Sequence, residues 1–135
     1  MKPLELAKVI LCIWLQSNAF GSGSFKIEPN TDLVQTLIHY FLHFGAPAMV
    51  AFVFFKKNWI SVFLIFIATM LVDIDHVLAT PIFQANRCSI NFHPLHTYYA
   101  MSAYGILLFL RRPYNLIGLG LCMHMLTDWI DCQMM

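Results

Sequence analysis

The segment "WISVFLIFIATMLVDIDHVLAT", residues 59–80, decides the fold. At roughly 22 residues it is long enough to cross a hydrocarbon core of about 30 Å as a helix. It nevertheless carries Asp73, Asp75 and His76, with no lysine or arginine beside them. A carboxylate at the centre of a bilayer costs on the order of 2.5–3.5 kcal/mol, so these groups need protonation, water or a bound cation. The segment therefore predicts a membrane helix that ends at a polar site.

The composition fits a small integral membrane domain. Of 135 residues, 59% are hydrophobic and only 11% are charged, and the mean hydropathy is +0.68. In soluble domains about 25% of residues are charged. The net charge of +1 and the lack of a long basic run argue against a nucleic-acid partner.

Apolar runs predict an all-α fold, an integral membrane bundle of four transmembrane helices. The first two runs are long enough to span a bilayer. The fourth run is shorter, and it can still serve as a span if its end is surrounded by protein and not by lipid. The four runs are residues 33–55, 59–80, 98–110 and 114–131.

Two tight basic turns predict how the helices are oriented. Lys56 and Lys57 join the first two runs, and Arg111 and Arg112 join the last two. The positive-inside rule places both turns in the cytoplasm. We therefore expect two antiparallel hairpins, with the long loop between them on the opposite face.

The first 32 residues differ from the rest, and we divide the chain into an N-terminal segment, 1–32, and a membrane domain, 33–135. The segment has a charged start, a short apolar core at residues 9–15 and a Gly/Ser-rich linker. It fits a signal peptide or an uncleaved amphipathic helix on the membrane surface, and both alternatives stay open.

Histidine and aspartate residues recur at spacings suited to metal ligands. Separations of three or four residues put side chains on one helical face, where a pair can hold one ion. The spacings are H-x-x-x-H in "HYFLH", H-x-x-H in "HPLH" and H-x-x-x-D in "HMLTD". Counted at about 1.5 Å per residue from the basic turns, most of these residues reach one layer near the non-cytoplasmic face. The predicted metal ligands are His39, Asp73, Asp75, His76, His93, His96, His124 and Asp128.

Other polar residues receive different predictions. His43, one turn deeper than His39, is expected to be a hydrogen-bond partner between helices, and Asp131 a solvated carboxylate. Arg87 in the long loop would hold an anionic head group, or else lie in solvent or against lipid.

Mixed imidazole and carboxylate ligands suit zinc, with iron or manganese as alternatives, and eight candidates leave room for two or more ions. Such a site can activate water, with Asp73 or Asp75 as the catalytic base. We therefore expect a metal-dependent hydrolase of phosphoesters that acts on a membrane lipid or a lipid-linked phosphate.

Three alternative functions stay open. A di-iron membrane oxidase or desaturase would be richer in histidine, and its site would face the cytoplasm. A transporter would continue its polar residues to the inner side. A non-catalytic metal-binding protein would have a closed site with four ligands per ion.

The four cysteines show no C-x-x-C spacing, which excludes the usual zinc-ribbon and thioredoxin motifs. Cys88 and Cys132 fall on the same predicted outer side. In an oxidising compartment they could form a disulfide that fixes the loop over the site.

The motifs "DIDH", "HPLH" and "HMLTD", with "HYFLHFGAP" and "NRCSINFHPLH", resemble an uncharacterised family of small bacterial membrane proteins close to the inner-membrane metal-dependent hydrolases. That group looks distantly similar to zinc-dependent phospholipase C and single-strand nucleases. The resemblance covers about residues 35–133 and implies an inner-membrane location, where the orientation predicted from the basic turns makes the site face the periplasm. The hydrolase relatives commonly have H-x-x-x-x-H where this chain has H-x-x-H. The ligand roles implied by the resemblance fall on His39, Asp75, His76, His124 and Asp128.

Overall fold

The computed structural model describes residues 31–78 and 88–134, and it confirms the predicted all-α fold. No strand occurs within these two ranges. The predicted N-terminal segment, up to residue 30, lies outside them. The elements, in chain order, are α2 (Thr31–Tyr40), the π-helical turn η1 (Phe41–Gly45), α3 (Ala46–Phe54), α4 (Trp59–Thr69), the 3₁₀ segment η2 (Met70–Leu78), the short 3₁₀ turn η3 (Pro94–His96), α5 (Tyr98–Leu107) and α6 (Tyr114–Met134).

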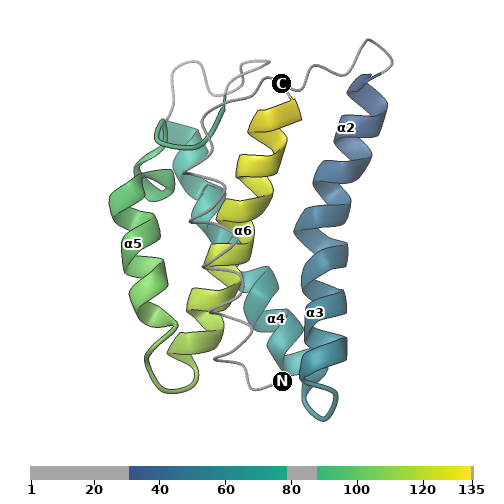
Figure 1. The fold of residues 1–135 in the computed structure, drawn as a ribbon, viewed down its shortest axis with the longest axis vertical. Helices are drawn as coiled ribbons and strands as arrows, with labels where there is room; N and C mark the ends of the chain where they lie inside the picture. Colours follow the sequence, from purple (N-terminus) through teal and green to yellow (C-terminus); the bar gives the residue numbers. More distant parts are fainter. Residues whose placement is uncertain (1–30, 79–87, 135) are drawn as a thin grey trace.

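These elements form four antiparallel rods (Figure 1). The first rod is α2, η1 and α3 in continuous succession, and the second is α4 followed by η2. Two stretches within them are long and apolar enough to cross a membrane, Thr36–Phe54 with 19 residues and Trp59–Leu78 with 20. The described helices thus match the four apolar runs, apart from small shifts at their ends.

Helix α6 packs against both α5 and α4, and α4 packs against α3. The main core lies between them, away from the His and Asp residues, and consists of Ala51, Phe55, Val62, Phe66, Leu108, Leu116, Leu119 and Met123. A smaller cluster of Val72, Met101 and Met125 packs separately. The bundle therefore has an apolar part that fixes the helices and a polar layer held by them.

Two glycines let α6 approach its neighbours closely. A Cβ atom at Gly120 would lie 2.7 Å from the Thr69 hydroxyl oxygen on α4. A Cβ atom at Gly118 would lie 2.7 Å from the Cβ of Leu107 and 2.9 Å from the backbone oxygen of Tyr104 on α5. Small residues at helix interfaces are typical of membrane bundles, because they allow backbones to meet.

We expect Gly118→Ala to destabilise the bundle by about 1–3 kcal/mol, the usual cost of overpacking, because the atoms that it meets belong to backbone or to a Cβ. Gly105→Ala on α5 is the matched control, since nothing lies within 4 Å of its added Cβ. It should be neutral, or stabilising by roughly 0.5–1 kcal/mol through helix propensity. Thermal unfolding of the two variants in detergent measures the difference, and equal midpoints would contradict the close approach of α5 and α6.

The two basic turns lie together at one end of the bundle. Lys56, Lys57 and Arg112 line one shallow surface pocket, and the Arg112 guanidinium lies 5.6 Å from the centre of the Phe55 ring. The opposite end carries η2, η3 and the C-terminal part of α6 (Figure 1). The fold therefore separates the basic residues of the two turns from the His and Asp residues by the length of the helices.

Candidate metal centre

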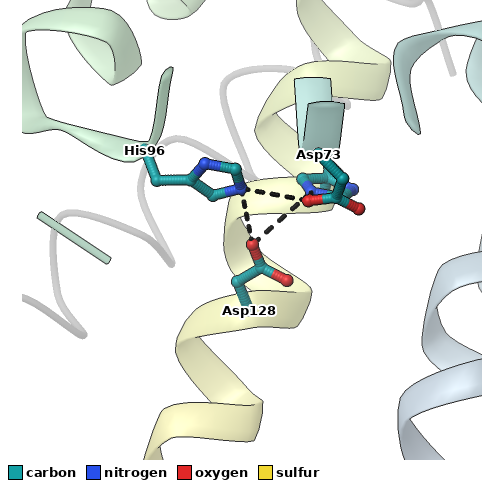
Figure 2. Close-up of side chains that lie close together, drawn as sticks. Asp73, His96 and Asp128 are labelled. Carbon is teal, nitrogen blue, oxygen red and sulfur yellow. Dashed lines mark hydrogen bonds and ion pairs between the residues drawn. The ribbon is translucent and has the colours of Figure 1, made fainter. Parts of the chain in front are cut away.

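Four side chains from three separate elements meet near the end of the bundle opposite the basic turns. Asp73 comes from η2, His96 from η3, and His124 and Asp128 from α6. Figure 2 shows Asp73, His96 and Asp128 pointing toward one another across a small space. Each of the four offers a nitrogen or oxygen atom, and these atoms lie within 4.8 Å of one another.

The distances between these atoms match a single bound ion. His96 Nε2 lies 3.3 Å from Asp73 Oδ1 and 3.0 Å from Asp128 Oδ2. His124 Nε2 lies 3.0 Å from Asp73 Oδ1 and 3.4 Å from Asp128 Oδ2. In a tetrahedral zinc site with bonds of about 2.0–2.1 Å, neighbouring donor atoms are about 3.3 Å apart. Four of the six distances between the donors therefore have the spacing found around a single zinc ion, and the other two are within 4.8 Å.

Acceptors behind both imidazole rings suit them to ligation. The Nδ1 atom of His96 lies 3.2 Å from Asp75 Oδ2, and the Nδ1 atom of His124 lies 3.0 Å from the sulfur of Met70. With an ion in the space, each Nδ1 would carry the proton toward these acceptors and each Nε2 would offer its lone pair to the ion. Ligating histidines in metalloproteins are usually fixed in this way.

Two atoms of the centre are buried polar groups without a hydrogen bond. His96 Nε2 and Asp128 Oδ2 have no hydrogen-bond partner among the described residues, although they lie 3.0 Å apart. Leaving buried polar atoms unsatisfied costs about 1–3 kcal/mol each. A cation between them would satisfy both atoms at once. The donor set and its geometry thus fit a divalent metal.

No basic side chain of the described helices reaches this end. The described lysines and arginines are all in the two turns at the other end. Burial lowers the pKa of His96, but the close carboxylates of Asp128, Asp73 and Asp75 outweigh burial and raise it to about 10. The carboxylates therefore create a position that attracts positive charge.

Asp75 and His76, which the sequence places among the ligands, form a second group with His96. The Oδ2 atom of Asp75 accepts a hydrogen bond from the Leu95 backbone N–H at 2.7 Å and faces His96 Nδ1. Its Oδ1 atom lies 3.2 Å from His76 Nδ1. Because His96 cannot donate through Nδ1 and also bind an ion there, the simplest role for Asp75 is to orient His96. The geometry is that of a carboxylate behind a ligating histidine.

The centre is closed on three sides and open on the fourth. The side chains of His96 and His124 are fully buried, and 7% of the Asp128 side chain is exposed. The Asp73 side chain is 41% exposed. Solvent or a substrate can therefore approach from the Asp73 side. In a catalytic site His96, His124 and Asp128 would hold the ion, and the exposed Asp73 would leave the fourth position to water, since such a site keeps one position open.

Of the remaining predicted site residues, the structure describes His39 and His93. His39 is partly exposed, and its Nδ1 atom lies 3.6 Å from Asp131 Oδ2. His93 is buried and stacks on His76, with ring centres 3.9 Å apart. Arg87 lies outside the described residues. Ligation by His39 and His93, and the substrate role of Arg87, stay predictions.

His43 is the residue whose position the sequence reasoning missed. It is buried, and its Nε2 atom lies 3.3 Å from Asp128 Oδ1. The sequence did contain information on the depth of His43. It lies twelve residues from Phe55, and a rise of about 1.5 Å per residue places it roughly 18 Å above Phe55. The same count from Arg112 gives about 18 Å for His124. The two histidines are level, and their ring centres are 4.8 Å apart.

A disulfide ties the segment before η3 to the end of α6. Cys88 and Cys132 are bonded, with Cα atoms 5.0 Å apart, a pairing that the sequence allowed but left open. Ser89, next to Cys88, contacts His76 Nε2 through its hydroxyl at 3.1 Å. The bridge therefore holds this segment beside the His and Asp layer.

The chain belongs to a family of unknown function (DUF6122), whose sequence model matches residues 33–135. The matched region includes all of the His and Asp residues described above and the disulfide. No curated protein and no solved structure shows significant similarity to the chain.

Proposed function

We propose that this protein is a membrane-embedded, metal-dependent hydrolase of phosphoesters in a lipid or lipid-linked substrate. The observation that carries the proposal is the set of four donor atoms within 4.8 Å of one another, with the Asp73 side chain exposed. With His96, His124 and Asp128 as its protein ligands, the ion would keep a fourth position for water beside Asp73, as catalytic sites do.

The outer surface of the helices supports a membrane location. Only 17% of the residues in the first candidate span and 28% in the second are buried inside the protein. Large apolar side chains such as Leu37, Phe52 and Leu64 are exposed. The core helix of a soluble protein would bury such residues, so a lipid environment explains them better.

The orientation follows from the two ends of the bundle. Basic turns favour the cytoplasm, which puts the metal centre at the non-cytoplasmic face, the periplasm of a bacterial cell. The disulfide between Cys88 and Cys132 supports this assignment, because disulfides persist in oxidising compartments.

In the proposed reaction the ion and Asp73 have different roles. A bound divalent ion, zinc in our proposal with iron or manganese as alternatives, supplies charge stabilisation and lowers the pKa of a water molecule toward about 7. Asp73, at the open edge, takes the proton of the water that attacks phosphorus. The bond from phosphorus to the ester oxygen then breaks, and the leaving alkoxide takes up the proton that Asp73 had accepted, which releases the alcohol.

A lipid substrate is favoured by an apolar cavity of about 610 Å³ between α4, η2, α5 and α6. At one end it is lined by Val72 and Leu95, the chain neighbours of Asp73 and His96, and it reaches Pro113 near the basic turns. An acyl chain in this cavity would place its head group beside the open edge of the centre.

The second candidate function is a structural metal clamp, favoured by the burial of His96, His124 and Asp128. A clamp binds metal but turns over no substrate, which makes the two functions separable by experiment.

Metal analysis and hydrolysis assays on the purified full chain in phospholipid nanodiscs test the proposal. We expect each chain to bind one or more divalent metal ions. We also expect the protein to hydrolyse bis(p-nitrophenyl) phosphate or a fluorescent phosphatidylcholine. A chelator should abolish the hydrolysis, and Zn²⁺, Fe²⁺ or Mn²⁺ should restore it. Bound metal without hydrolysis of either probe would favour the clamp, and a chain without affinity for these ions would refute both functions.

A further inference from the structure

His96 is the one residue shared by the two groups of potential metal ligands among the described residues. Its donor atom and those of Asp75 and His76 lie within 4.8 Å of one another, as do the four atoms of the centre above. Figure 2 shows one ring nitrogen of His96 aimed at Asp73 and Asp128 and the other facing away from them. That other nitrogen, Nδ1, lies 3.2 Å from the Asp75 carboxylate. The buried ring therefore presents one nitrogen to each group.

Two atoms of the second group are buried polar atoms without a hydrogen bond. They are Asp75 Oδ1 and His76 Nδ1, which lie 3.2 Å apart. That distance is short enough for an ion pair, yet the two atoms form no hydrogen bond with each other or with any other residue that the structure describes. An ion pair alone would thus leave both atoms unsatisfied, whereas a cation between them would bind both.

The other polar atoms of Asp75 and His76 have partners that leave these two atoms free to bind an ion. Asp75 is only 2% exposed, and its Oδ2 atom accepts a hydrogen bond from the Leu95 N–H at 2.7 Å. His76 Nε2 lies 3.1 Å from the hydroxyl oxygen of Ser89. With an ion on Nδ1, Nε2 would carry the proton and Ser89 would accept it. Ligating histidines usually have such an acceptor behind them.

We propose a second divalent cation site held by Asp75 Oδ1, His76 Nδ1 and His96 Nδ1, with His96 as the bridge to the ion of the four-residue centre. With only the first ion bound, His96 Nδ1 carries its proton toward Asp75. Metal binding releases protons from the ligands, so the second ion takes the place of this proton, which passes to water. The mixed nitrogen and oxygen donors suit Zn²⁺, Mn²⁺ or Fe²⁺. Three protein ligands leave a further position open.

The second position lies at the open edge of the first. His76 Nδ1 is 3.6 Å from Asp73 Oδ1, and the two side chains are 31% and 41% exposed. An ion beside His76 would therefore add positive charge where a phosphate group reaches the centre, and its open position could orient a phosphate oxygen. The inference rests on the proposed four-residue centre, because His96 belongs to both sites.

Titration of the full chain in phospholipid nanodiscs with Mn²⁺, followed by metal analysis and electron paramagnetic resonance, tests the site. The wild type should bind two Mn²⁺ per chain, and coupling between them should broaden the six-line spectrum of an isolated ion. His76→Gln should bind one Mn²⁺ and give the narrow six-line spectrum, because it removes a ligand of the second ion alone. Val77→Ala, an exposed change at the next residue of η2, is the matched control and should keep two coupled ions.

The outcomes separate the second site from the first. One Mn²⁺ per wild-type chain, removed by His124→Ala but kept by His76→Gln, would overturn the second site and leave the first in place. One ion that His76→Gln removes and His124→Ala keeps would overturn the bridge and the four-residue centre together. Two ions in His76→Gln would overturn the role of His76, and a chain without affinity for Mn²⁺ and Zn²⁺ would overturn both sites. If His76→Gln does not fold, Asp75→Asn should also bind only one ion, and two ions in that variant would refute the second site.

Discussion

His96→Ala is expected to remove the ion from the four-residue centre. His96 Nε2 is the donor nearest to Asp128 Oδ2, at 3.0 Å, and it also lies 3.3 Å from Asp73. Its loss leaves three protein donors and takes away the ring that Asp75 orients. The fall in metal affinity should exceed the roughly 10- to 100-fold that is typical of losing an outer-shell partner. Competition with a chromophoric chelator measures the affinity, and metal analysis after dialysis measures the content.

Two further variants make this result diagnostic. Asp75→Asn should weaken metal binding by only about 10- to 100-fold, because it changes the carboxylate behind His96 and leaves all four donors in place. His93→Ala is the matched control from the same loop, since His93 is buried but lies in neither group of potential ligands. Size exclusion and circular dichroism check that each variant folds. A His96→Ala chain that folds and keeps its metal, beside a His93→Ala chain that loses it, would refute the four-residue centre.

The sequence was enough to predict the helices and the layer in which the polar residues meet. Hydropathy alone located the four rods, because each is a long apolar run that ends at a turn or a polar motif. The layer followed from counting helical rise from the basic turns, since antiparallel helices of similar length bring equal counts to equal depth. The same topology placed Cys88 and Cys132 on one side of the membrane, but it could not show that they are close enough to pair, as they are in the structure.

The sequence could not predict which residues of this layer face the four-residue centre and which stand behind it. The motif "DIDH" favours Asp75 and His76 as ligands, whereas Asp73 has the oxygen that faces His96 and His124. The reason is local winding, because residues 70–78 form a 3₁₀ helix. In that geometry residues three apart are aligned, and Asp75 turns toward the backbone N–H of Leu95 in the loop. A regular α-helical count cannot show this, because the loop that captures Asp75 is distant in sequence.

His43 shows the opposite case. The sequence contained its depth in the bundle, but the more common role of a histidine in a membrane helix outweighed that information. Its depth matches that of His124, yet a lone histidine in a membrane helix is more often a hydrogen-bond partner between helices. The π-helical turn brings its ring to Asp128 on α6, so the predicted contact between helices is formed, and it is formed at the edge of the four-residue centre.

Asp73→Asn is expected to lower hydrolysis by about 10²- to 10⁴-fold, the usual contribution of a general base. Asparagine keeps the size of the side chain and an oxygen that can ligate, but it cannot take a proton from water at neutral pH. His96, His124 and Asp128 stay in place, so the variant should retain its metal. The measurement is the rate of bis(p-nitrophenyl) phosphate hydrolysis, set beside the metal content of the same sample. Ser61→Ala, an exposed change on the same rod near the basic turns, is the matched control and should leave both unchanged.

The paired measurement separates the two roles that the position of Asp73 allows. If Asp73 serves as the base, the Asn variant keeps its ion and loses turnover, because the exposed edge of the centre is where a water must lose its proton. If Asp73 serves only to bind the ion, metal content and turnover fall together, and added metal restores both. Full turnover in the Asn variant would exclude Asp73 as the base, and would move that role to another group at the same open edge.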